Sequence, residues 1–201
     1  MAAPSTRDKI LEAARQLFWD AGYEATSLQQ IAQDAGVHPG SVYYVFRTKE
    51  DILLAVLDWY LENLEPILIE PLFSSVSDPI ERITGLLAGY RMQLVATGFT
   101  RGCPIGNLAL QVGRAIPRAQ EKVRANFAGW KAWVGQCVRE AASGAIPEED
   151  VASAATFVLT VMEGAVMQSL TEASIEPFDQ CVRELRRYLA ASFSKKEESA
   201  S

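Results

Sequence analysis

The residues best suited to chemistry are concentrated in one stretch, TSLQQIAQDAGVHPGSVYYVFRTK, which runs from Thr26 to Lys49. It holds the single histidine of the chain together with hydroxyl, phenol, amide and cationic side chains. Such groups exchange hydrogen bonds with phosphate oxygens and with the edges of bases. The composition of this stretch therefore favours binding of a nucleic acid over the making or breaking of covalent bonds.

Two short helices are predicted here, joined by a glycine turn. Ser27, with Gln30 three residues later, is typical of a helix N-terminus, and Gly36 permits a left-handed turn. Pro39 suits the first position of a second helix, because that position needs no amide donor. We expect this second helix from Gly40 to Phe46, about two turns and too short to be stable alone. The pattern predicts a helix-turn-helix.

The second helix is expected to present an aromatic, polar and small-residue surface. Val42 and Phe46 should face inward, with Val37 filling the turn. The outward residues are then His38, Pro39, Gly40, Ser41, Tyr43, Tyr44 and Arg47. A short exposed helix with such a surface is typical of proteins that enter the major groove of DNA.

The charge of the chain gives this interpretation little support. The formal net charge is −6, and residues 1–50 hold five Lys and Arg against six Asp and Glu. A nucleic-acid-binding domain usually carries a basic footprint. Local positive charge remains at Arg7, Lys9, Arg47 and Lys49, and the amides of helix N-termini bind phosphate without a charged side chain. We therefore expect a weakly basic face that relies on amides and hydroxyls as well.

The composition is that of an ordinary soluble globular protein, with 201 residues of which 49% are hydrophobic and 22% charged. The start MAAPSTRDK lacks the pattern of a signal peptide, and charges interrupt each apolar stretch before roughly 18 residues, so no membrane is expected. Three widely spaced cysteines suit reduced thiols better than disulfides. The expected location is the cytoplasm.

The sequence contains no signature of an enzyme, a metal site or a cofactor site. His38 has no second histidine for a metal pair and no Cys or Ser with which to form a catalytic arrangement. No glycine-rich phosphate loop follows a strand, because no strand is predicted. We therefore expect no catalytic activity, no metal and no cofactor.

Helical periodicity continues along the chain and predicts an all-α fold. Ser5 with Asp8 resembles a capping box, and Thr48 with Asp51 begins a helix that we expect to end at Pro66. Further helices are expected over residues 78–98, from 117 to about 142, over 148–173 and over 177–193. The polar tail 194–201 is expected to be disordered.

The run TRDKILEAARQLFWDAGYEATSLQQIAQDAGVHPGSVYYVFRTKEDIL resembles the N-terminal domain of the TetR family of transcriptional repressors. The resemblance implies a homeodomain-like three-helix DNA-binding domain over residues 1–48 and a linking helix over 49–71. It also implies a C-terminal helical domain over 72–193 that dimerises and binds a small molecule, with about nine helices in all. Double-stranded operator DNA, a small-molecule effector and a second copy of the chain are the implied partners.

The family's DNA contacts can be carried over onto matching positions of this sequence. They fall at the start of the first helix of the motif, along the second helix and at the start of the linking helix. These positions are Thr26, Ser27, His38, Pro39, Gly40, Ser41, Tyr43, Tyr44 and Lys49. Among them, the position of His38 is variable in the family and is expected to tune the choice of operator.

The stretch RGCPIGNLALQ, from Arg101 to Gln111, resembles a branch of the same family in which Gly-Cys-Pro-x-Gly-Asn-Leu follows the fifth helix. Some members of that branch respond to drug-like or plant-derived aromatic compounds. A helix start at Pro104 and the nearby Arg101 would both lower the pKa of the Cys103 thiol and make it a possible sensor of oxidants or electrophiles. The alternative, which we favour, is that Cys103 is a small buried apolar residue.

Aromatic and methionine side chains are more numerous in the second half than a minimal bundle needs. Such side chains at helical spacing are usually core, but the family resemblance implies that some line a ligand cavity. The candidate ligand-binding residues are Tyr90, Leu94, Asn107, Gln111, Trp130, Trp133, Phe157 and Glu163. Glu163 has an alternative role as the ion-pair partner of an arginine such as Arg91.

The helices at 148–173 and 177–193 are the expected dimer pair, by resemblance to the family. The first carries the small residues Ala152, Ala155, Gly164, Ala165 and Ser169, which allow close approach. The second carries an apolar stripe formed by Phe178, Val182, Leu185, Leu189 and Phe193. The alternative is that both helices pack these residues onto the core of their own chain.

The resulting hypothesis is a transcriptional repressor that binds a palindromic operator as a homodimer and is released by a small apolar or aromatic effector. The rival interpretation is a small-molecule or thiol-redox sensing module without strong operator binding. The acidic balance of the first 50 residues is the observation that favours the rival.

Overall fold

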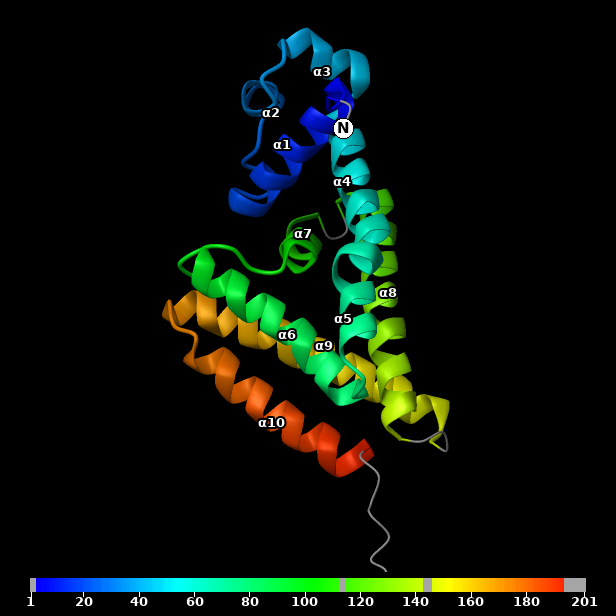
Figure 1. The fold of residues 1–201 in the computed structure, drawn as a ribbon. Helices are drawn as coiled ribbons and strands as arrows, with labels where there is room; N and C mark the ends of the chain where they lie inside the picture. The colour runs from blue at the N-terminus through cyan, green and yellow to red at the C-terminus, as the bar shows by residue number, and fades with distance from the viewer. Residues whose placement is uncertain (1–2, 113–114, 143–145, 194–201) are drawn as a thin grey trace, which may run out of the picture. The chain divides into compact units, whose positions relative to one another are not determined.

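A computed structural model describes residues 3–112, 115–142 and 146–193, and this part of the chain is helical without strands (Figure 1). The elements are α1 (Thr6–Asp20), α2 (Leu28–Asp34), α3 (Pro39–Val45), α4 (Lys49–Leu64), η1 (Glu65–Ile69), α5 (Glu70–Ser75), α6 (Pro79–Ala96), α7 (Pro104–Val112), α8 (Pro117–Ala141), α9 (Glu148–Glu172) and α10 (Glu176–Phe193). Because α4, η1 and α5 follow one another without a break, the described residues form nine continuous helical segments, and the all-α prediction is confirmed. The tail 194–201 lies outside the described residues.

Helix starts coincide with the capping patterns of the sequence. The Oγ of Ser5 accepts a hydrogen bond from the Asp8 amide at 3.2 Å, and the Oγ of Ser27 accepts one from the Gln30 amide at 3.2 Å. Each capping box is reciprocal, and the hydrogen bonds from Ser5 hold the pKa of Asp8 below its ordinary value. Local side-chain chemistry therefore sets where these helices begin.

The α-helix predicted to run up to Pro66 is α4, which ends at Leu64. The chain stays helical through a π-helical turn, Glu65–Ile69, and continues as α5 to Ser75. A proline lacks an amide donor and its ring clashes with the carbonyl one turn earlier, which a regular α-helix does not accommodate. The wider π turn loosens the helix at this point and lets it continue past Pro66 and Pro71.

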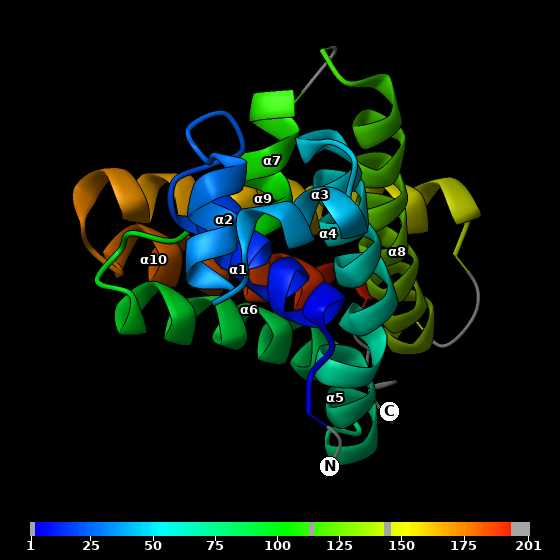
Figure 2. The ribbon, with the colours of Figure 1, turned by 90° about the horizontal axis from the view of Figure 1, so that it is seen from above.

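The described chain divides into two compact units, Met1–Asn63 with Arg101–Asn126, and Leu64–Thr100 with Phe127–Ser201. In the first unit, α1, α2 and α3 pack on one another, as Figure 2 shows. Ile10, Phe18, Ile31 and Val42 are buried among them. This core fixes the three-helix arrangement that the sequence predicts.

The second unit contains α6, α9 and α10 side by side (Figure 1). Its core includes Phe178, Leu185, Leu189 and Phe193, which are all buried within this one chain. The stripe on α10 therefore packs onto its own chain, which is the alternative considered above. On α9, the predicted small interface residues Ala155, Ala165 and Ser169 are also buried in the chain.

One described helix, α9, is long and apolar enough to cross a membrane by length and composition alone. Its apolar side is used in the second unit, because α9 packs against α10 and α6 and buries residues such as Val158, Leu159 and Met162. Core helices of globular proteins commonly have this composition.

Candidate functional site

Helix α3 is held to the first unit by its two inward residues. Val42 is fully buried, and Phe46, which ends the helix, is almost so. The other side of α3 carries Tyr43 and Tyr44, which are 59% and 92% exposed. Large aromatic side chains that are this exposed mark a surface that contacts another molecule. The predicted inward and outward sides of this helix are confirmed.

His38 is the N-cap of α3. Its Nδ1 accepts a hydrogen bond from the Gly40 amide at 3.1 Å, and Pro39 takes the first helical position. With Nδ1 used as an acceptor, the neutral ring carries its proton on Nε2, which makes Nε2 a donor on the exposed surface. The capping role was missed in the sequence, because histidine is not among the preferred N-cap residues.

Thr26 and Lys49 act inside the first unit. Thr26 is only 2% exposed and its Oγ1 donates to the Gly22 carbonyl at 2.7 Å. The Nζ of Lys49 donates to the carbonyls of Tyr23 and Thr26 at 2.9 and 3.0 Å and lies 4.2 Å from the centre of the Tyr23 ring. Burial raises the pKa of Tyr23. In this structure both side chains hold the α1–α2 turn, and their role in DNA contact stays a prediction.

The positive charge available to a phosphate backbone is smaller than the residue count suggests. Arg15 pairs with Glu12 at 2.7 Å and lies 4.3 Å from the centre of the Trp59 ring, so it belongs to the scaffold as Lys49 does. No hydrogen bond or ion pair within the described residues engages the side chain of Arg7, Lys9 or Arg47, and the guanidinium of Arg7 lies 5.6 Å from the centre of the Phe46 ring. Within residues 3–50, these three side chains are therefore the cations that are available to bind a phosphate.

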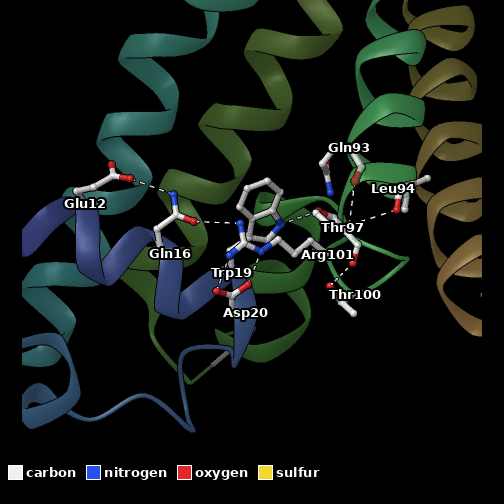
Figure 3. A network of polar contacts seen from close by, with 10 residues as sticks. Glu12, Gln16, Trp19, Asp20, Gln93, Leu94, Thr97, Thr100 and Arg101 are labelled. Atoms are coloured by element: carbon white, nitrogen blue, oxygen red, sulfur yellow. Dashed lines mark hydrogen bonds and ion pairs between the residues drawn. The ribbon is translucent and has the colours of Figure 1, made fainter. Parts of the chain in front are cut away.

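The segment before α7 is bound to α1 by a polar network (Figure 3). The guanidinium of Arg101 forms two hydrogen bonds with the Asp20 carboxylate and a third, at 3.1 Å, with Gln16. The indole of Trp19 donates to the Gly102 carbonyl at 2.7 Å. No pattern in the sequence predicts this network, because its partners lie more than 80 residues apart.

Gln111, near the end of α7, makes the second attachment. Its Oε1 accepts a hydrogen bond from the Tyr23 amide at 2.6 Å. Gly22, beside it, has a φ of +87°, and a Cβ there would lie 2.6 Å from the Gln111 amide group. Only glycine fits this position. The predicted ligand residue Gln111 thus already has a structural partner in the first unit, to which Asn107 also belongs.

The environment of Cys103 favours the structural alternative. Its side chain is 3% exposed, and its Sγ accepts a hydrogen bond from the Gly106 amide at 3.3 Å. The charge of Arg101 is directed to Asp20. Cys137 is also buried, and burial raises the pKa of its thiol to about 12. Reactive cysteines are usually more exposed than these two.

The predicted ligand residues of the second unit fall into two places. Tyr90 and Trp130 are buried with ring centres 6.2 Å apart, Leu94 is fully buried, and Trp133 packs edge-on against Phe73. The Nε1 of Trp133 is buried without a hydrogen-bond partner in the described residues. An unsatisfied buried donor costs about 1 to 3 kcal/mol, so a bound molecule that accepts from it would be favoured.

Phe157 and Glu163 differ from this buried group. Phe157 is 44% exposed on the outer side of α9, with its ring edge-on to Tyr188 of α10. Glu163 is half-buried, and Arg91, its alternative partner, forms an ion pair with Asp179. The structure thus brings Tyr90 together with Trp130 and leaves Phe157 at the surface.

Two family models match this chain. The model for bacterial regulatory proteins of the tetR family matches residues 10–56. A model for the C-terminal domain of LmrA/YxaF-like transcriptional regulators matches residues 79–184, which is more than half of the chain.

Individual relatives agree with these matches. The HTH-type transcriptional regulator YxaF of Bacillus subtilis is 28% identical over 172 residues, covering 86% of this chain and 88% of YxaF. The HTH-type transcriptional repressor DhaR of Mycobacterium sp. is 26% identical over 182 residues and 90% of each chain. The crystal structure of a TetR regulatory protein from Rhodobacter sphaeroides has a TM-score of 0.82 at 22% identity, covering 91% of this chain and 98% of its own, and shows the shared fold. The chain therefore belongs to the TetR family of DNA-binding transcriptional regulators.

Proposed function

We propose that this protein is a transcriptional repressor that binds a palindromic operator as a homodimer and leaves it when a small apolar or aromatic effector binds. The observation that carries the proposal is α3, a capped helix that exposes Tyr43 and Tyr44 and is anchored by Val42. The cytoplasm is the location that such a role requires. That a relative of similar length is named a repressor supports the direction of the regulation.

Operator binding requires two copies of α3, because one copy has little charge with which to hold DNA. Arg7, Lys9 and Arg47 would neutralise phosphates, while His38, Ser41 and Tyr44 would reach base edges or the sugar-phosphate backbone. Two recognition helices bind successive major grooves when they are about 34 to 36 Å apart. Affinity then depends on the element that sets this spacing.

The exposed sides of α9 and α10 are the surfaces that we assign to the dimer. Phe157, Met167 and Tyr188 are large apolar residues exposed there, and a Cβ at Gly164 would meet no atom within 4 Å. An exposed apolar stripe with a small residue in its middle is suited to close packing against the same stripe of a second copy. This interface differs from the one expected from the sequence, because the α10 stripe is already buried.

The effector would bind among the buried aromatic residues Tyr90, Trp130 and Trp133, with the Nε1 of Trp133 as a donor for a polar group on the ligand. The likeness of residues 101–111 to a branch that responds to aromatic compounds supports this ligand class. A difference of about 1 to 3 kcal/mol in effector affinity between two conformers weakens operator binding 5- to 150-fold. The attachments of Arg101 to Asp20 and of Gln111 to the Tyr23 amide offer one route by which the change could reach α1.

The test is a gel shift with DNA from upstream of the protein's own gene, titrated with salt. Three cations in each of two copies predict a slope of about −5 in a plot of log affinity against log salt, at about −0.9 per phosphate neutralised. Specific binding that persists at moderate salt supports the repressor. Binding that is weak and equal on unrelated DNA would instead favour a sensing module without operator binding, as the five-to-six charge balance of residues 1–50 suggests.

Site selection with the His38→Ala variant tests the role of the recognition helix. The variant loses both the α3 cap and an exposed donor, and we expect it to select a different consensus from random duplexes. A Gln29→Ala variant, changed on the exposed surface of α2, is the control and should keep the wild-type consensus. If His38→Ala also selects the wild-type consensus, His38 has no part in base recognition.

A further inference from the structure

A groove runs between α6 and α10 in the second unit, where the two helices lie side by side (Figure 1). Its volume is about 750 Å³. Val76, Ala88 and Val182 supply apolar surface to it, above the buried Leu87 and Phe178, and arginines line the α10 side. None of the residues proposed above to bind DNA or the effector lines this groove, whereas Phe178 and Val182 belong to the α10 stripe that the sequence assigned to the dimer.

Two ion pairs cross the groove from one helix to the other. The Nε and Nη2 of Arg91 on α6 donate to the Asp179 carboxylate on α10 at 2.7 and 2.9 Å. Farther along, Arg186 on α10 donates to Glu81 on α6 at 2.6 Å. Ten residues separate the two α6 positions, which corresponds to about 15 Å along the helix. The two ion pairs therefore cross the groove about 15 Å apart along α6, and the part of the groove between them is called the slot.

Arg183 lies on α10 between the two ion pairs, one turn after Asp179. Of the four arginines that line the groove, Arg91, Arg186 and Arg187 each have a carboxylate partner, which for Arg187 is Glu184 at 2.7 Å. The side chain of Arg183 has no hydrogen bond or ion pair with any described residue; the hydrogen bond from Arg91, and to a lesser extent the charge of Arg183, lower the pKa of Asp179. The slot thus offers one cation that no described residue matches.

We propose that this groove binds a monocarboxylate with an apolar body, distinct from the effector of the proposed function. The guanidinium of Arg183 binds the carboxylate, and the hydrocarbon part lies along the groove on Ala88 and Val182. A guanidinium presents parallel donors that match a carboxylate in a bidentate pair. An apolar floor with few polar groups is typical of small-molecule sites. One unmatched arginine suits a single negative charge, whereas a dianionic phosphate would need more.

The neighbouring charges explain why the ligand is an anion in spite of the net charge of −6. The lining residues include four arginines but only Glu81 and Asp179 as acids, so the groove is locally positive. Ala88, on the α6 side, is small and exposed, and it leaves room above the apolar floor. Size, charge and apolar surface therefore point to the same class of ligand.

The test is calorimetric titration of the full chain with decanoate, below its micelle concentration, and with decan-1-ol as the neutral probe of equal chain length. Decanoate is expected to bind. Decan-1-ol is expected to bind at least roughly tenfold more weakly than decanoate, because one charge-assisted hydrogen-bonded pair is lost. Arg183→Gln should weaken decanoate binding by roughly the same factor and leave decan-1-ol unaffected. The matched control is Arg124→Gln on α8, an exposed arginine outside the groove, which should bind as the wild type does.

Ala88→Phe is the second variant, since it fills the slot without removing a charge. It should abolish decanoate binding while the far-ultraviolet circular dichroism and the operator affinity stay those of the wild type. The proposal is overturned if decanoate does not bind, if decan-1-ol binds equally well, or if Arg183→Gln and Ala88→Phe both bind decanoate with wild-type affinity. The last result would mean that decanoate binds outside this groove, for example in the effector cavity. These affinities for decanoate do not depend on DNA binding, so a failed operator gel shift would leave the conclusion about the groove unchanged.

Discussion

Two pairs of aromatic side chains, one pair in each unit, occupy opposite environments. Tyr43 and Tyr44 on α3 are mostly exposed, whereas Trp130 and Trp133 on α8 are 7% and 5% exposed. The sequence analysis placed the first pair on the DNA-binding surface and the second in a ligand cavity. Exposed aromatic residues cost the folded chain little when removed, and buried ones a great deal. The difference separates a surface kept for a macromolecule from an interior that holds the unit together.

The largest expected difference between the buried and the exposed aromatic residues is in how much the free energy of unfolding falls when one is replaced by alanine. Trp133→Ala should lower the free energy of unfolding by about 3 to 5 kcal/mol, because it leaves a cavity in the second unit. Tyr44→Ala, the exposed counterpart, should change it by less than about 0.5 kcal/mol. Urea denaturation followed by circular dichroism measures both. Equal losses in the two variants would mean that the exposure of Tyr44 does not describe the protein in solution.

The next prediction concerns the exposed apolar stripe of α9, which we assign to the interface with a second copy of the chain. Gly164→Leu should cost about 1 to 3 kcal/mol at each of two symmetric positions and shift the dimer towards monomer in sedimentation experiments. Gly89→Leu on α6 is the control, since a Cβ there also meets no atom within 4 Å. A Gly164→Leu variant that remains dimeric would remove α9 from the interface.

Operator affinity is expected to show a smaller effect at the recognition helix. Tyr43→Phe removes one hydroxyl from an exposed ring and should weaken binding to all duplexes by about 0.5 to 1.5 kcal/mol through loss of a phosphate contact. Fluorescence anisotropy with operator and with unrelated DNA measures the change. If only the operator is affected, Tyr43 reads bases and does not contact the backbone.

Thiol alkylation should have the smallest effect of these changes. We expect it to leave effector-induced release from DNA unchanged. Cys103 and Cys137 are buried, and the raised pKa of Cys137, about 12, keeps that thiol protonated and unreactive at pH 8. Mass spectrometry after iodoacetamide should find both unmodified in the native protein and modified in urea. Release that is triggered or abolished by alkylation would establish Cys103 as a sensor.

The sequence was sufficient where the information is local. Ser5, Ser27 and Thr48 begin helices with the partners that their spacing predicts, and Gly36 turns the chain between α2 and α3 with a φ of +62°. Capping and periodicity operate within one or two turns of the chain, so they can be read without knowing the fold. The local pattern also distinguished the buried Val42 from the exposed Tyr43.

Candidate site residues were less predictable because their roles depend on distant partners. Lys49 faces carbonyls more than 20 residues away, and Gln111 an amide 88 residues away, so neither use is visible in a local window. The same is true of the apolar stripe on α10, whose spacing fits equally well the core of its own chain or a second copy. Only the packing of α10 on α9 and α6 decides between them.

The sequence by itself thus determined an all-helical chain with a helix-turn-helix near its start, because short-range hydrogen bonds and helical periodicity specify both. Only the tertiary structure decided which amphipathic faces are already covered, which cations are used within the fold, and that Arg183 lies between two crossing ion pairs without a partner among the described residues. The physical reason is that burial and ion pairing are properties of residues brought together by packing. Arg91 and Asp179 are 88 positions apart in the chain, yet 2.7 Å apart in space.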